Sequence, residues 1–221
     1  MRSAKILDGL FYDYVIVTEA DADRAFYQEI NERLLRFMPD LGIPNCLFVN
    51  WQGKQTEKTI IRPLRELGIP TVGIVDIDVI KDGGKVWTTF LESGFVPKDE
   101  QQSLALMRSA IKLKFEESGQ DMKRNGGIEI LSESDKEAAN NILDRLAQFG
   151  LFVARKGEVE SWLSDLDVSR EKTKWLTNIF EKMDEDPDLK DYIKPTEDDV
   201  WDFIGQIKNW LIDPNRNGIP T

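Results

Sequence analysis

The stretch YVIVTEADADR, residues 14–24, decides the fold of this chain. Its first part, residues 14–18, is a short apolar run rich in β-branched side chains, which favour strand over helix. Its second part is acidic, and aspartates suit the first turn of a helix because they complement the helix dipole. Apolar residues then recur at helical spacing to about residue 37. The stretch therefore predicts a buried strand followed by a helix that buries one face.

The same alternation continues along the chain. It predicts a second strand at 46–50, a helix over about 56–67 and a third strand at 71–75. A fourth strand is predicted at 151–154, followed by a helix that contains Trp162. A β-α-β-α-β order implies right-handed crossovers and a parallel sheet. We therefore predict an α/β fold in which helices cover both faces of a parallel sheet.

Two segments do not follow this alternation. Residues from about 86–148 are predicted as several helices broken by glycine and proline, and they form a helical insertion before the fourth strand. The last part of the chain is helical in pattern and rich in tryptophan and acids, which indicates either a docking face or a part of the core. The predicted division is a catalytic domain over 1–165, with the insertion inside it, and a helical extension over 166–221.

Composition excludes several kinds of site. The chain has 221 residues, 41% of them hydrophobic, and no histidine, which rules out histidine-based zinc sites and Ser-His-Asp triads. The single cysteine, Cys46, lies in an apolar run and is expected in the core. The net charge of −11 argues against binding nucleic acid by charge alone, although bound metals would cancel part of it. No signal peptide or membrane span is predicted, so we expect a cytoplasmic protein.

Acidic residues follow the first and the third predicted strands. Glu19, Asp21 and Asp23 come after the first, and Asp76 and Asp78 after the third. In an open α/β sheet the carboxyl ends of neighbouring strands share one crevice, so these carboxylates would converge and repel one another. A hard divalent cation such as Mg²⁺ would relieve that repulsion. The Asp-x-Asp spacing is predicted to place both side chains on the same side, because strands alternate with period two.

Two lysine-containing turns are further candidates. Residues 52–54, Gln-Gly-Lys, follow the second strand, where Lys54 could reach a phosphate. Residues 156–160, Lys-Gly-Glu-Val-Glu, follow the fourth, where Glu160 could complete a metal site and Lys156 could stabilise charge in a transition state. The alternative interpretation is a plain turn with a solvated lysine for the first and an ordinary helix start for the second. No P-loop and no dinucleotide-binding glycine motif is present, so the chain carries no ATP site of that kind.

These residues together resemble a known family. Residues 17–24 resemble the VEGxxDR motif of Toprim domains. Residues 50–54 are similar to the GGK turn, and residues 68–78 to the GIP…VxDxD stretch, of nucleases of the OLD (overcoming lysogenization defect) family. Residues 156–160 resemble the late KGxxE element of that family, in a looser register. The resemblance spans most of the chain.

The resemblance implies a Toprim fold and cleavage of DNA with two Mg²⁺ or Mn²⁺ ions. Lys156, Glu19 and Asp76 would form the catalytic set. The residues that match family positions are the metal ligands Glu19, Asp23, Asp76, Asp78 and Glu160, the catalytic lysine Lys156 and the phosphate contact Lys54. The chain has Ala20 where the family usually has glycine. Such nucleases usually carry an ABC-type ATPase domain, which is therefore an expected partner in a full-length protein.

Three other functions fit part of the pattern. A receiver-like signalling domain would use Asp76 as phosphoacceptor and Lys156 as its lysine, but the long insertion fits it poorly. A phosphatase of the haloacid dehalogenase type also uses Asp-x-Asp, normally after the first strand rather than the third. A Toprim module that binds partners without catalysis is the third possibility, to which Ala20 gives some weight.

Overall fold

The structure is a computed structural model that describes residues 7–50 and 57–219. Its centre is a sheet of four strands in the order β2-β1-β3-β4, and every neighbouring pair is parallel. The strands are β1 (Tyr14–Thr18), β2 (Cys46–Asn50), β3 (Thr71–Asp76) and β4 (Leu151–Ala154). All four predicted strands are confirmed, and only β3 is longer than predicted, by one residue. The predicted α/β class and its parallel sheet are therefore confirmed.

Helices connect the strands and follow the last one. The α-helices are α2 (Asp21–Phe37), α3 (Glu57–Glu66), α4 (Gly84–Ser93), α5 (Lys98–Ser118), α6 (Glu133–Ala147), α7 (Lys172–Met183) and α8 (Asp199–Ile212). Short 3₁₀ turns are η1 (Gly9–Phe11), η2 (Ile77–Ile80), η3 (Gly127–Ile130), η4 (Val159–Ser161) and η5 (Ser164–Leu166). The helical insertion between β3 and β4 is thus present and consists of α4, α5, η3 and α6.

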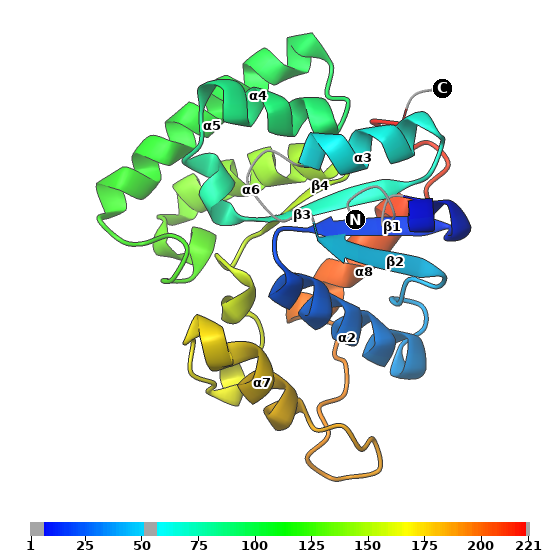
Figure 1. Cartoon of the computed structure of the whole chain (residues 1–221). Coiled ribbons are helices and arrows are strands. Elements are labelled where there is room, and N and C mark those ends of the chain that lie inside the picture. The colour runs from blue at the N-terminus through cyan, green and yellow to red at the C-terminus, as the bar shows by residue number, and fades with distance from the viewer. Residues whose placement is uncertain (1–6, 51–56, 220–221) are drawn as a thin grey trace.

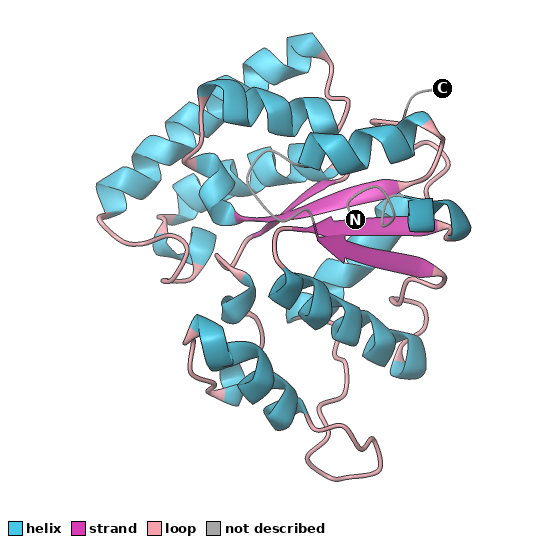
Figure 2. Cartoon of the chain, in the orientation of Figure 1, coloured by secondary structure: helices cyan, strands magenta, loops and turns pink. Residues whose placement is uncertain are grey.

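Helices lie on both faces of the sheet (Figures 1 and 2), and strand side chains alternate between two apolar cores, one on each face. Val15 and Val17 of β1 join the core beneath α3, α4, α5 and α6, whereas Ile16 between them joins the core beneath α2, α7 and α8. The same division holds in β4, where Val153 faces the first core and Phe152 the second. Both faces of the sheet are therefore covered, which leaves its carboxyl edge as the place where polar side chains can gather.

The predicted helix around Trp162 is wrong. The chain instead forms the two short turns η4 and η5, with Leu163 between them in the left-handed region at φ 50°. Trp162 itself is buried, and its ring nitrogen donates a hydrogen bond of 2.9 Å to the buried hydroxyl of Tyr27 on α2. The apolar residues of this segment are thus explained by burial of single side chains rather than by a helical face.

The C-terminal segment contributes to the core. Helix α8 lies against the sheet beside α2, and its buried side chains include Trp201 and Ile204. The tryptophan-rich end was predicted to be either a docking face or a part of the core, and the structure shows that α8 is part of the core. The division of the chain near residue 165 stays a prediction. No described helix has the length and apolar character needed to cross a membrane.

Candidate metal centre

Three carboxylates converge at the carboxyl edge of the sheet. Glu19 follows β1, Asp76 ends β3, and Asp78 lies in η2, so two neighbouring strands supply all three. One carboxylate oxygen from each lies within 4.8 Å of the other two. All three side chains are half-buried. A set of oxygen donors at this spacing suits a hard divalent cation such as Mg²⁺ or Mn²⁺, and its chemistry therefore fits the predicted ion.

The Asp-x-Asp pair comes together by a different route from the one predicted. Strand alternation does not place both aspartates, because β3 ends at Asp76 and the chain enters η2 at Ile77. The backbone N–H of Ile77 donates a hydrogen bond of 2.9 Å to the carbonyl oxygen of Gly157, which ties this turn to the loop after β4. The tight 3₁₀ turn thus brings Asp78 back beside Asp76.

A hydrogen bond joins the ends of the two strands. The backbone N–H of Asp76 donates to Oε1 of Glu19 over 3.0 Å. Burial nevertheless raises the pKa of Glu19 to about 8, and the negative charges of Asp76 and Asp78 add to that rise. Burial also raises the pKa of Asp76. These carboxyl groups hold protons more tightly than usual in the metal-free protein, as expected where like charges meet in a partly buried site.

Lys123 is a part of this site that the sequence did not reveal. Its Nζ lies 2.5 Å from an oxygen of Asp76 and 3.4 Å from an oxygen of Asp78. It comes from the turn between α5 and η3, 45 residues after Asp78 along the chain. No strand end precedes it and no motif contains it. Only a contact between the helical insertion and the sheet edge could have identified it.

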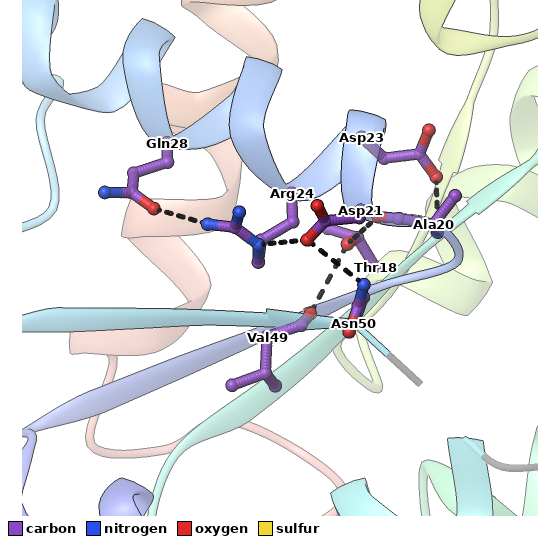
Figure 3. A network of polar contacts seen from close by, with 8 residues as sticks. All are labelled: Thr18, Ala20, Asp21, Asp23, Arg24, Gln28, Val49 and Asn50. Carbon is purple, nitrogen blue, oxygen red and sulfur yellow. Dashed lines mark hydrogen bonds and ion pairs between the residues drawn. The ribbon is translucent and has the colours of Figure 1, made fainter. Parts of the chain in front are cut away.

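The acids that open α2 have separate roles (Figure 3). Oδ1 of Asp21 accepts from Arg24 over 2.8 Å and from Asn50 over 3.3 Å. Asp21 is therefore not one of the three carboxylates whose oxygens lie within 4.8 Å of one another. Asp23 accepts a hydrogen bond from the backbone N–H of Ala20 over 3.0 Å and so caps the helix.

Asp23 nevertheless belongs to the surroundings of the site. Burial, together with the charges of Asp76 and Glu160, raises its pKa to about 7. Glu160 is half-buried in η4. The group of three carboxylates close enough to share one ion does not include Asp23 or Glu160 among the described residues. Their assignment as ligands stays a prediction.

Lys156 has a carboxylate partner of its own. Its Nζ lies 2.5 Å from Oδ1 of Asp199, the first residue of α8, and 5.8 Å from the centre of the Trp162 ring. Its side chain is 41% exposed. Among residues 7–50 and 57–219, the ion pairs with Asp76 and Asp78 are made by Lys123, and the catalytic role of Lys156 stays a prediction. Lys54 lies outside the described residues.

A parallel α/β sheet with this acidic group at its carboxyl edge is a candidate metal-binding domain. The family model for the "Overcoming lysogenization defect protein-like, TOPRIM domain" matches residues 10–78. The matched segment includes β1 to β3 and all three clustered carboxylates, and the match confirms the resemblance of this part of the sequence to the OLD-like Toprim domain. Searches of curated proteins and of solved structures found no match to the chain.

Proposed function

We propose that the chain is a metal-dependent DNA endonuclease, the catalytic part of an OLD-family nuclease. The observation that supports this most directly is the set of carboxylate oxygens of Glu19, Asp76 and Asp78, mutually within 4.8 Å, in a Toprim segment. The proposal that the ions are Mg²⁺ or Mn²⁺ rests on the all-oxygen donor set. When bound, such ions would polarise the phosphodiester and make a water molecule a stronger nucleophile.

The residues of the site would divide the work of holding the ions and the substrate. Glu19, Asp76 and Asp78 would hold one ion, because their oxygens are already close together. Asp23 and Glu160 would hold a second, because the charge of Glu160 acts on Asp23 and both lie beside the triad. A scissile phosphate placed between the two ions would have its P–O bond aligned for attack.

Lys156 would act on the phosphate only after leaving Asp199. A half-exposed lysine can turn from one anion to another at modest cost, because an ion pair in contact with water is weak. A phosphate with charge building on its oxygens offers a stronger partner. In this role Lys156 would stabilise charge in the transition state, and Asp199 would hold its ammonium group near the edge of the sheet beforehand.

The charge of the chain makes the proposed metal ions important for binding as well. With a net charge of −11, the protein repels the DNA backbone at long range. Divalent ions at the triad would supply local positive charge at the point where the phosphate must lie. An ABC-type ATPase domain, the partner implied by the family, would supply further contacts in a full-length protein.

Plasmid cleavage tests the proposal. Supercoiled plasmid is incubated with the purified chain and Mg²⁺, Mn²⁺ or EDTA, alongside Asp76→Ala and the control Asp21→Ala. We expect nicking or linearisation with Mg²⁺ or Mn²⁺ alone, and a loss of at least about a hundredfold in Asp76→Ala, because the triad loses a ligand. Asp21→Ala should stay within about threefold of the wild type, since Asp21 pairs with Arg24 outside the triad.

Two results would contradict the proposal. Equal activity of Asp76→Ala and the wild type would show that the cleavage does not use this site. Intact plasmid in every reaction, together with measured binding of Mn²⁺ and DNA, would favour the second candidate, a Toprim module that binds without cutting. The Toprim match leaves the receiver-like and phosphatase interpretations without support.

A further inference from the structure

The helical insertion places a cation against two of the three clustered carboxylates. The ammonium group of Lys123 contacts Oδ2 of Asp76 at 2.5 Å and Oδ2 of Asp78 at 3.4 Å. All three side chains are shielded from solvent, with 22% of Lys123, 15% of Asp76 and 28% of Asp78 exposed. An ammonium group bridging two carboxylates occupies the coordination directions that a bound divalent ion would need.

The backbone fixes the position of this lysine. Its N–H donates to Oδ1 of Asp121 over 2.9 Å, and the N–H of Gly127 donates to the carbonyl oxygen of Met122 over 2.9 Å. The N–H of Ile128 then donates to the carbonyl oxygen of Arg155 over 2.9 Å, which joins this turn to the loop after β4. These hydrogen bonds therefore hold the backbone of Lys123 at the edge of the sheet.

We propose that Lys123 is the internal counter-ion of the metal centre and that a divalent ion must displace it from Asp76 and Asp78 to bind. This inference rests on the proposed function, because it takes the triad as the metal site. In the metal-free protein Lys123 offsets the repulsion between the carboxylates and keeps them positioned. When an ion binds, the ammonium group gives up both contacts, so the protein exchanges one cation for another at the same oxygens.

Competition has a measurable consequence for affinity. If the ammonium group must leave before the ion binds, its removal should tighten metal binding, because binding then no longer requires two ion pairs to be broken. If Lys123 only supports the local structure, its removal should weaken binding or leave it unchanged. The two roles therefore predict opposite changes in the dissociation constant.

Calorimetric titration of the full chain with Mn²⁺ measures this constant without any activity assay. The variant Lys123→Met removes the charge and keeps most of the side-chain length. We expect it to bind Mn²⁺ roughly fivefold more tightly than the wild type. Lys123→Arg, which keeps a competing cation, should stay within about twofold of the wild type.

Arg124→Met is the matched control for simple electrostatic repulsion. It removes one positive charge from the next residue of the same turn, where the side chain is exposed. We expect a change in affinity of less than about twofold, because that charge is screened by solvent. Equal tightening in Lys123→Met and Arg124→Met would overturn the proposal, since it would reflect net charge alone.

Other outcomes separate this inference from the proposed function. If the wild type binds Mn²⁺ and Lys123→Met binds it equally or more weakly, the counter-ion role is wrong while the metal site stands. If neither the wild type nor Lys123→Met binds Mn²⁺, the metal site itself is wrong. Thermal unfolding in EDTA checks folding: Lys123→Met should unfold cooperatively at a lower midpoint than the wild type, and Mn²⁺ should raise its midpoint by more.

Discussion

At the scale of single residues, Glu19 is the group on which burial and mutual repulsion act most strongly. It accepts from the backbone of Asp76, yet it faces two other carboxylates in a partly buried position. Its pKa of about 8 lies well above the ordinary value of 4.5. At neutral pH this carboxyl group is therefore mostly protonated in the folded, metal-free protein, whereas it is ionised in the unfolded chain.

This predicts how stability depends on pH in EDTA. Between about 4.5 and about 8 the folded protein binds more protons at Glu19 than the unfolded chain does. The free energy of unfolding should therefore be greatest near pH 5 and fall as pH rises through 8. The thermal midpoint should be lower above pH 8 than near pH 5, by about 5 °C or more. Asp23, with a pKa of about 7, acts in the same direction. Differential scanning fluorimetry across this range measures the slope.

Glu19→Gln provides the check, because it removes the titrating group and keeps the shape of the side chain. We expect a flatter decline with pH in this variant than in the wild type. Glu181→Gln, at an exposed position on α7, is the control for the lost charge and should keep the wild-type slope. A decline of the same size in all three proteins would assign the effect to net charge rather than to the site.

At the scale of elements, the loop after β4 joins the parts of the site. The carbonyl oxygen of Gly157 accepts from Ile77 in the Asp-x-Asp turn. Gly157 has φ +121°, and a Cβ atom there would overlap the carbonyl oxygen of Lys123. The glycine of the Lys-Gly-Glu-Val-Glu turn is thus required by close packing of two backbones.

We predict that Gly157→Ala destabilises the protein by about 2–4 kcal/mol, because it combines an unfavourable φ with a backbone overlap. Denaturant unfolding measures the difference. Gly119→Ala is the matched control, since Gly119 also has a positive φ of +66° but a Cβ there meets nothing within 4 Å. That variant should lose only about 1 kcal/mol. Equal losses in both would show that the overlap has no energetic weight.

The elements also show what the sequence could and could not predict. The four strands were predictable because each is a short apolar run between breakers. The turn around Trp162 was not, since its apolar residues fill separate positions in the core and mimic a helical face. Glu19, Asp76 and Asp78 were predictable from strand ends. Lys123 was not, because its role depends on how the insertion folds back over 45 residues.

At the scale of the whole molecule, α8 closes the second face of the sheet. Trp201 is 2% exposed and Ile204 is fully buried beneath the strands, in the same core as Ile16 of β1. A sheet with one face uncovered would expose a continuous apolar surface to water. The end of the chain therefore contributes directly to the stability of the Toprim sheet.

We predict that Trp201→Ala destabilises the protein by about 3–5 kcal/mol through the cavity it leaves. Ile212→Ala, at the end of the same helix and 49% exposed, should cost less than about 1 kcal/mol. Chemical denaturation followed by circular dichroism compares the two. A small loss in Trp201→Ala would mean that α8 can detach from the sheet without unfolding it.

The close backbone contact between Gly157 and Lys123 has a consequence for the speed of metal loading. Since the two loops are packed together at their main chains, neither can swing open alone. Release of Asp76 and Asp78 then needs rotation about the side-chain bonds of Lys123 rather than a movement of the backbone. The backbone of the centre is already in place before any ion arrives, so loading would proceed without a slow conformational phase.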